Sequence, residues 1–471
     1  MPRQTEKIES YLKDQEQKEL LRFIACGSVD DGKSTLIGRL LHDSKTLYED
    51  QIAALKEGSK KGGAQDDELD LSLLVDGLQA ELEQKITIDV AYRYFSTKRR
   101  KFIVADTPGH EQYTRNMATG ASSADLAIIL IDATKGVSTQ TKRHSYIVHL
   151  LGVDCVAVAI NKMDAIGYER ERYEAIAADY AELAAQIGIK RVAFFPVSAL
   201  KGDNIVSKSE NTKWFDRTPL MEFLETVEIA RGKTADFRFP VQLVVRPDRH
   251  FRGFAGTIAS GVVRAGDPIR VLPSGAVSRI ARIVTYDGDL QSARTDMAVT
   301  LTLTDEIDVS RGDTIVKEGE EPPQIASDFE ADLVWLGEEP LGLDKSYLIK
   351  IGTKTMPANV TAIKYLIDVN SLKRREASQI ALNSICRVSI AALGSLVFDP
   401  YDQNRATGGF ILIDRFSNAT VAAGMIRAKA QSAEIAFASK NDRPNAFEIE
   451  LNALIRKHFP HWRAKDISQN L

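Results

Sequence analysis

The hydropathy pattern of the first half of the chain predicts strands that alternate with helices. Short apolar runs typical of buried strands occur at residues 22–26, 90–95, 102–105, 126–131, 155–160 and 192–197. The segments between most of these runs have apolar residues at helical spacing. A charged helix is expected to precede them at 8–19. Leu220, Phe223 and Leu224 indicate a helix that closes the domain. This order is typical of a doubly wound α/β domain with a mostly parallel sheet.

The second half of the chain changes character near residues 233–235. Short β-type runs recur between turn signals such as Arg252-Gly253, Gly266-Asp267 and Gly312-Asp313, which predicts a small β-barrel ending in a linker at 319–323. A second β-rich unit follows, and an amphipathic stretch lies at 447–455. We therefore predict an α/β domain at 1–235, a first β-barrel at 236–327, and a second β-barrel with a C-terminal tail at 328–471.

Composition narrows the classes of protein. The 471 residues include 61 Lys and Arg against 65 Asp and Glu, so the basic surplus usual in nucleic-acid-binding proteins is absent and no nucleic-acid partner is expected. The basic run at 98–101 lies between two β-type runs and is better explained as a solvated hairpin turn. No apolar run is long enough for a membrane span, and three widely spaced cysteines favour a reducing compartment. We expect a cytoplasmic protein without a membrane partner.

Residues 27–34 read Gly-Ser-Val-Asp-Asp-Gly-Lys-Ser and fit the G-x-x-x-x-G-K-[ST] pattern of a phosphate-binding loop. A predicted strand precedes them and a helical pattern follows, as the pattern requires. Glycines let the backbone N–H groups wrap the phosphates, and the helix N-terminus adds partial positive charge. Lys33 is expected to reach the β- and γ-phosphates and Ser34 to bind Mg²⁺. This loop alone leaves ATP and GTP both open.

Asp106-Thr107-Pro108-Gly109-His110 follows the predicted strand at 102–105. Asp106 can hold Mg²⁺, and the N–H of Gly109 can contact the γ-phosphate, so that loss of this phosphate would release the segment. His110 is expected to orient the attacking water; the alternative is a plain turn histidine. Thr87 is the candidate for a second hydroxyl ligand of Mg²⁺, although a Thr in an apolar β-type run is usually only a strand residue.

Asn161-Lys162-Met163-Asp164 follows the predicted strand at 155–160. Asp164 can accept hydrogen bonds from N1–H and the exocyclic amine of guanine, whereas adenine would leave the carboxylate unpaired. Asn161 can bond both base and loop, the Lys162 stem can lie along the ring, and the segment that begins Ser198-Ala199 can supply a backbone N–H to the guanine carbonyl. Three motifs in this order, each after a predicted strand, favour GTP over ATP.

The candidate residues therefore form three groups, with Mg²⁺ as cofactor and GTP as substrate. The phosphate-binding group contains Gly27, Ser28, Val29, Asp30, Asp31, Gly32, Lys33, Ser34, Thr35 and Gly109. The guanine-binding group contains Asn161, Lys162, Met163, Asp164, Ser198 and Ala199. The switch residues are Thr87, Asp106, Thr107 and Pro108; the catalytic residue is His110; and the Mg²⁺ ligands are Ser34, Thr87 and Asp106.

These motifs resemble those of the translational GTPase superfamily, in which an α/β P-loop G domain precedes two β-barrels. Within it, the chain resembles the GTPase subunits of bacterial sulfate adenylyltransferase from about residue 22 to its end. Three stretches carry this resemblance: 27–41, with Asp31 where elongation factors usually have His; 75–81 leading into 86–95; and 404–414 continuing to 421–426. The chain has Leu82 and Lys85 where that family usually has Arg and Gly.

The resemblance implies a heterodimer in which a small nucleotidyltransferase subunit makes adenosine 5′-phosphosulfate and pyrophosphate from ATP and sulfate. The present chain would couple GTP hydrolysis to that uphill step. The sequence contains neither a Ser-Gly-Gly-x-Asp-Ser loop nor a His-x-Gly-His motif, so adenylyl transfer is expected on another chain. The alternatives are a translation GTPase that carries tRNA or a release factor, and a relative devoted to sulfation of a secreted molecule.

Overall fold

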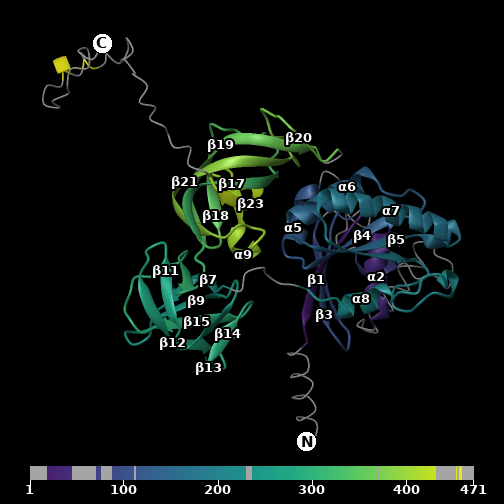
Figure 1. The fold of residues 1–471 in the computed structure, drawn as a ribbon, viewed down its shortest axis with the longest axis horizontal. Helices are drawn as coiled ribbons and strands as arrows, with labels where there is room; N and C mark the ends of the chain where they lie inside the picture. Colours follow the sequence, from purple (N-terminus) through teal and green to yellow (C-terminus); the bar gives the residue numbers. More distant parts are fainter. Residues whose placement is uncertain are drawn as a thin grey trace, which may run out of the picture. The chain divides into compact units, whose positions relative to one another are not determined.

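The computed structural model describes residues 18–44, 71–75, 87, 89–110, 113–229, 236–368, 371–430, 452, 454 and 456–458. The chain divides into two compact units, Met1–Ala428 and Lys429–Leu471. Most of the helix expected at 8–19, most of the amphipathic stretch at 447–455, and the positions of Leu82 and Lys85 lie outside the described residues. Within the first unit, an α/β domain is followed by two β domains, as Figure 1 shows.

The α/β domain contains a six-stranded sheet in the order β2-β3-β1-β4-β5-β6. The strands are β1 (Leu20–Cys26), β2 (Ala91–Ser96), β3 (Lys101–Asp106), β4 (Leu126–Asp132), β5 (Cys155–Asn161) and β6 (Arg191–Pro196). Only β2 is antiparallel to its neighbour; all other pairs are parallel. The prediction of a doubly wound, mostly parallel sheet is therefore confirmed.

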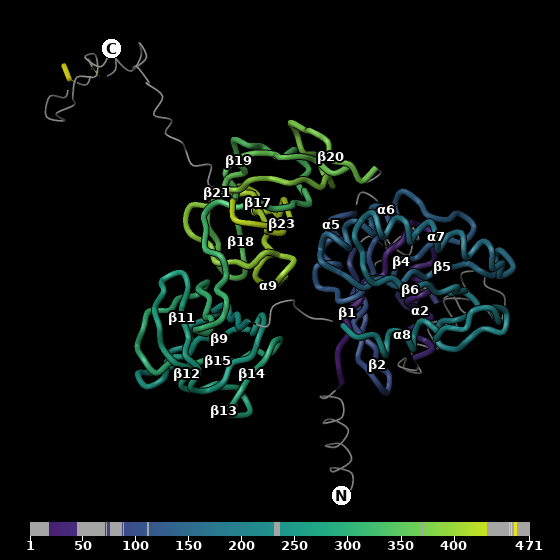
Figure 2. The backbone as a smooth tube through the Cα atoms, viewed as in Figure 1, coloured from purple at the N-terminus to yellow at the C-terminus, as the bar shows by residue number. Residues whose placement is uncertain are grey.

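Helices cover both faces of this sheet (Figure 2). The helices are α2 (Lys33–Asp43), α5 (Thr114–Ser122), α6 (Thr139–Leu150), α7 (Arg170–Ile187) and α8 (Leu220–Thr226), with short 3₁₀ turns at Leu71–Leu74, Met163–Ile166 and Glu210–Thr212. Met117, Ile147 and Tyr180 of α5, α6 and α7 pack on one face, whereas α2 and α8 pack on the other. Because β4 and β5 are buried on both faces, their sequences are apolar up to the last residue, Asp132 or Asn161, instead of alternating.

The basic run at 98–101 forms the predicted hairpin turn between β2 and β3, where Thr97 N–H donates to the Arg100 carbonyl. Arg100, however, is buried instead of solvated. Its guanidinium donates to the carbonyls of Leu224 and Val227, at the end of α8. This residue therefore holds the closing helix to the edge of the sheet, which its position in a charged run did not indicate.

The first β domain is a curled sheet in the order β7-β16-β11-β12-β15-β9-β8, with β13 paired to β12. Arg238 bridges to Ser260, just beyond β9, so the sheet curls back towards its first strand around one apolar core. Its strands, with the two-stranded sheet β10–β14, are β7 (Arg238–Pro240), β8 (Leu243–Val245), β9 (Gly253–Thr257), β10 (Val262–Arg264), β11 (Pro268–Leu272), β12 (Val277–Thr285), β13 (Gly288–Leu290), β14 (Ser292–Arg294), β15 (Ala298–Leu303) and β16 (Thr314–Lys317).

The second β domain is a closed barrel, because β18 pairs with both β22 and β19 at the two ends of the order β18-β22-β23-β17-β21-β19. Its elements are β17 (Gln324–Trp335), β18 (Ser346–Ile351), β19 (Lys354–Asp368), β20 (Lys373–Arg375), β21 (Ile385–Phe398), α9 (Arg405–Gly408), β22 (Gly409–Asp414) and β23 (Thr420–Lys429). The boundary predicted at residue 328 falls inside β17, whose first residue, Gln324, already pairs with Phe398 of this barrel.

Candidate functional site

The three predicted motifs lie at one edge of the α/β sheet. β1, β3 and β5 are parallel, and the phosphate loop, the 106–110 segment and the 161–164 segment begin at their carboxyl ends. Ala25 pairs with Asp106, and Asp132 of β4 pairs with Asn161, so the strands end at nearly the same level. The carboxyl edge of an open parallel sheet is where such folds bind ligands.

The phosphate loop is a tight turn that packs directly on the predicted base-reading motif. Gly32 has φ of 90°, and the space that a Cβ would need there is filled by the Asn161 side-chain amide. Asp30 also has a positive φ, of 68°. Asp31 is buried, and its carboxylate accepts a hydrogen bond from the Ser28 N–H at 2.6 Å. Burial raises the pKa of Asp31. Only glycine fits at position 32, because both the backbone and the neighbour exclude a side chain.

Lys33 points into the loop instead of into solvent. Its Nζ donates to the carbonyls of Gly27 at 3.0 Å and Ser28 at 2.9 Å. Burial lowers the pKa of Lys33, while the nearby carboxylates of Asp106 and Asp31 act in the opposite direction. Ser34 and Thr35, in the first turn of α2, are half-buried. A cation thus lies at the helix N-terminus, where an anion is favoured.

The segment after β3 lies against this loop. Thr107 Oγ1 donates to the Ala25 carbonyl at 2.9 Å. A Cβ on Gly109 would lie 2.5 Å from the Gly27 carbonyl oxygen and 2.6 Å from Lys33 Nζ, so no larger residue fits without displacing the loop. Pro108 is buried and His110 is exposed, with its ring centroid 6.2 Å from that of Tyr113. The structure therefore places Gly109 against the predicted phosphate site and His110 at its solvent side.

Thr87 is half-buried and precedes β2, which begins at Ala91, but its neighbours Ile86 and Ile88 are outside the described residues. Its expected role as a Mg²⁺ ligand stays a prediction.

The base-reading motif is braced from two sides by Asn161. Its Nδ2 donates to the Asp31 carbonyl at 2.8 Å, and its Oδ1 accepts the Ala199 N–H at 2.9 Å. Asn161 therefore joins the phosphate loop to the loop after β6. The Ala199 N–H is engaged by this contact, so a donor to a guanine carbonyl would have to come from a neighbour. Ser198 and Met163 are buried, whereas Asp164 is half-buried in the 3₁₀ turn Met163–Ile166.

Lys162 is held by a residue that the sequence analysis missed. It has a φ of 62°, and its Nζ lies 2.8 Å from Oδ2 of the buried Asp132. Burial pushes the pKa of Asp132 upwards, but hydrogen bonds from Lys162 and Thr134 outweigh it and leave the pKa lowered. An acidic residue directly after an apolar strand run was the available signal, as it was for Asp106. Asp132 therefore holds the end of the Lys162 side chain, and stacking of its stem on a base stays a prediction.

Two further contacts brace the site. Ser138, the N-cap of α6, lies 3.0 Å from Ser28 between their hydroxyl oxygens. Arg39 of α2 donates from Nε to the Ala199 carbonyl at 3.1 Å. A Ser before a helical pattern signals a cap, but nothing in the sequence connects it to residue 28.

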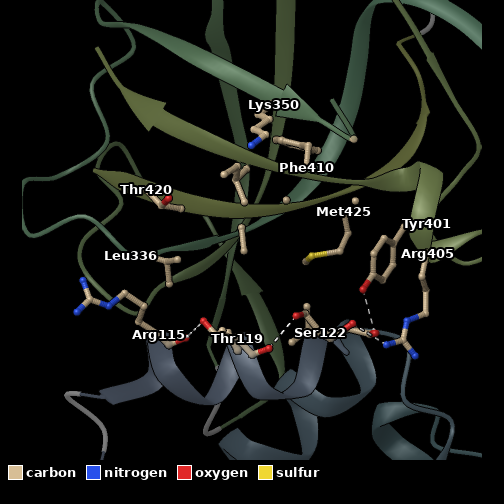
Figure 3. Close-up of a pocket in the computed structure, with 17 residues that line it drawn as sticks. Arg115, Thr119, Ser122, Leu336, Lys350, Tyr401, Arg405, Phe410, Thr420 and Met425 are labelled. Carbon is tan, nitrogen blue, oxygen red and sulfur yellow. Dashed lines mark hydrogen bonds between the residues drawn. The ribbon is translucent and has the colours of Figure 1, made fainter. Parts of the chain in front are cut away.

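A separate cavity of about 540 Å³ lies between α5 and the second barrel. Figure 3 shows α5 on one side of it, and Met425, Phe410 and Leu336 on the other. Tyr401 and Arg405 are also among its lining residues. None of the predicted site residues lines this cavity, so it is distinct from the nucleotide site.

Comparison with known proteins then decides the family. Residues 18–231 match the Elongation factor Tu GTP binding domain, and residues 328–427 match the GTP-eEF1A C-terminal domain-like family. The chain is 57% identical over 466 residues to sulfate adenylyltransferase subunit 1 of Saccharophagus degradans, with 98% of each chain covered. It belongs to the sulfate adenylyltransferase subunit 1 family. Two further members of the family match over nearly the same length. The protein of Alteromonas mediterranea is 57% identical, with 98% of each chain covered. The protein of Aliarcobacter butzleri is 56% identical, with 98% of this chain and 97% of the relative covered.

Membership in the sulfate adenylyltransferase subunit 1 family confirms the family resemblance and the predicted architecture of a G domain with two β-barrels. The relatives that match over the full length are named sulfate adenylyltransferase subunit 1, so the comparison does not favour a translation factor. In the described part of the chain, no helix combines the length and apolar character that a membrane crossing needs.

Proposed function

We propose that this chain hydrolyses GTP and couples the hydrolysis to formation of adenosine 5′-phosphosulfate from ATP and sulfate by a partner catalytic subunit. The observation that carries the proposal is the full-length match to sulfate adenylyltransferase subunit 1. The residues at the carboxyl edge of the sheet supply a matching site: a phosphate loop, a γ-phosphate segment in contact with it, and a base-reading motif braced by Asn161.

The residues present fit Mg²⁺ as the cofactor of that site. Ser34 stands in the first turn of α2, and Asp106 is a buried carboxylate at the end of the strand beside β1. Hydroxyl and carboxylate oxygens are hard donors of the kind Mg²⁺ prefers. Ser34, Asp106 and Thr87 would hold the ion, which supplies charge neutralisation at the β- and γ-phosphates. The protein's own part is to position these phosphates through Lys33 and the loop amides.

The partner is proposed to be a small nucleotidyltransferase, joined to this chain as a heterodimer in the cytoplasm. Three buried free cysteines, Cys26, Cys155 and Cys386, fit a reducing compartment. Purification of the tagged chain from its own cell lysate tests the assignment. A co-purifying subunit that makes adenosine 5′-phosphosulfate supports it. Recovery of tRNA or ribosomes instead would support the translation alternative and overturn the proposal.

GTP turnover is expected to depend on the partner. GTPases whose site is completed by another protein turn over on the order of 10⁻⁴–10⁻² s⁻¹ alone and much faster in the complex. We therefore expect slow hydrolysis by the isolated chain and clear acceleration by partner, ATP and sulfate together. Steady-state phosphate release with each component omitted in turn measures this. Equal rates with and without partner would remove the coupling from the proposal.

His110→Ala is expected to keep GTP affinity and to slow hydrolysis. His110 is exposed, and in its proposed role it orients the attacking water and does not hold the phosphates, so GTP affinity should not depend on it. Loss of a water-orienting group reduces the single-turnover rate on the order of 100-fold. The single-turnover rate of His110→Gln, which can still orient water, should fall between those of the wild type and His110→Ala. His250→Ala, on an exposed barrel loop, serves as control. A wild-type hydrolysis rate in His110→Ala would mean that His110 is a turn residue without a catalytic role.

A further inference from the structure

The first part of the family signature at residues 404–414, residues 404–409, contains none of the predicted nucleotide-site residues. It belongs to a segment, residues 399–409, that runs from the end of β21 through α9 to the start of β22. We call this the junction segment, because its side chains bond to the G domain and to the first barrel while its ends belong to the second.

On the G-domain side, two residues of the junction segment bind helix ends. Arg405 donates from Nη2 to the Ser122 carbonyl at 2.9 Å and from both Nη atoms to the Ala124 carbonyl at 3.1 Å. Its Nη1 also reaches the Gly152 carbonyl at 3.4 Å. Tyr401 donates from Oη to the Leu151 carbonyl at 3.0 Å, as Figure 3 shows. These carbonyls lie at or just beyond the C-terminal ends of α5 and α6, where unpaired carbonyls favour a cation or a donor.

On the first-barrel side, the junction segment contributes a buried ion pair. Asp399 and Arg238 are 4% and 2% exposed, and Arg238 Nε lies 3.1 Å from Asp399 Oδ2. Thr407 donates to the same carboxylate oxygen at 2.7 Å, and Asn404 Nδ2 donates to Ser260 Oγ at 3.1 Å. A buried pair with all these bonds resists separation, because removing one partner leaves an unpaired buried charge.

The other ends of α5 and α6 lie at the nucleotide site. α5 begins just after His110, and Ser138, which caps α6, lies against Ser28 of the phosphate loop. The two helices are about 13 Å and 18 Å long. Each therefore runs from the phosphate site to the junction segment as one rigid element.

We propose that the junction segment is an anchor that couples the positions of both barrels to the position of the G domain. Arg405 is its positioning residue. Arg405 touches no nucleotide-binding residue and acts through α5 and the chain after it. Because Asp399 and Asn404 connect the same short segment to the first barrel, a displacement of the helix ends reaches both barrels together. Gly152 and Gly408 fit this role: a Cβ on Gly152 would meet Arg405 Cδ at 3.0 Å, and one on Gly408 would meet Asp399 O at 2.6 Å.

The first test rests on the proposed function and uses the full chain with its partner. Arg405→Ala should leave GTP turnover of the isolated chain unchanged and lower the adenosine 5′-phosphosulfate formed per GTP hydrolysed at least about tenfold. Arg405→Lys keeps the charge but cannot reach three carbonyls at once, so it should restore this ratio only in part. Arg415→Ala, an exposed arginine of the same barrel, is the matched control. A wild-type ratio in Arg405→Ala would overturn the proposal.

The second test is independent of the partner. Amide hydrogen exchange at residues 122–124 and 151–153 should be slow in the wild type with GDP or a non-hydrolysable GTP analogue, and faster in Arg405→Ala and in Tyr401→Phe. Equal exchange in wild type and variants, or loss of protection in one nucleotide state, would show that the junction segment is not an anchor. If the wild-type complex shows no GTP-dependent synthesis of adenosine 5′-phosphosulfate, the proposed function fails. The hydrogen-exchange comparison still shows whether the junction segment is an anchor.

Discussion

Lys33→Ala is expected to abolish tight binding of GTP. The Lys33 ammonium is buried at the N-terminus of α2, within hydrogen-bonding distance of two loop carbonyls. Its transfer from these carbonyls to the phosphates exchanges neutral acceptors for anionic ones, which adds attraction between opposite charges in a buried setting. Loss of such contacts costs about 3 kcal/mol or more, or roughly 100-fold in Kd. Calorimetric titration of the wild type and the variant with GTP and with GDP measures this change in Kd.

The effect should be larger for GTP than for GDP, because the γ-phosphate is one of the two groups that Lys33 is expected to reach. Lys190→Ala is the matched control, since Lys190 is exposed and precedes β6 at the opposite edge of the sheet. Thermal unfolding of both variants separates lost binding from lost folding. An unchanged GTP affinity in a folded Lys33→Ala protein would remove Lys33 from the phosphate site.

The order of the G domain could be predicted because its strands are short apolar runs, and the central ones are buried on both faces. β4 and β5 have no exposed residue, so their sequences identify them within a residue or two. The motif residues then follow from the strands, since parallel strands bring their carboxyl ends to one edge. This is why positions as distant as Asp31 and Asn161 were predicted in one site, where a hydrogen bond joins them.

Contacts that depend on long-range packing were not predictable in the same way. Arg100 lies in a charged run yet is buried under α8, and Asp132 holds Lys162 from another strand. The second barrel begins at Gln324 because β17 continues through the expected boundary and pairs with β21. In each case the deciding partner is far away in the chain, and no local pattern of hydrophobic and polar residues specifies it.

The contacts of the junction segment could not be predicted from the sequence either, although part of it is a recognisable motif. Asn404 and Arg405 could be recognised as a family signature, but their partners Ser260 and Ala124 lie in two other domains. A signature identifies a family without stating which contact it makes. Only the fold connects this signature to the ends of α5 and α6.

Asp164→Asn is expected to change the base preference from guanine to xanthine. Asp164 lies in the 3₁₀ turn Met163–Ile166, directly after the buried Met163 and Lys162, which Asp132 holds. A carboxylate accepts from both N1–H and the amine of guanine. The amide of Asn offers one acceptor and one donor, and the donor faces the guanine amine unfavourably. Xanthine carries an oxygen at that position, which restores the pair.

The preference for GTP over XTP should therefore reverse, with GTP affinity lowered on the order of 10³-fold, since a site built for specific hydrogen bonds rejects the mismatched edge strongly. Competition between GTP and XTP for the purified protein gives the ratio directly. Asp179→Asn, an exposed change of the same type on α7, should leave it unaltered. A variant that still prefers GTP by the original factor would mean that backbone groups, and not Asp164, read the base. The shape of the guanine edge argues against that outcome, because it presents the N1–H and an amine N–H side by side, and the two oxygens of a carboxylate can accept both.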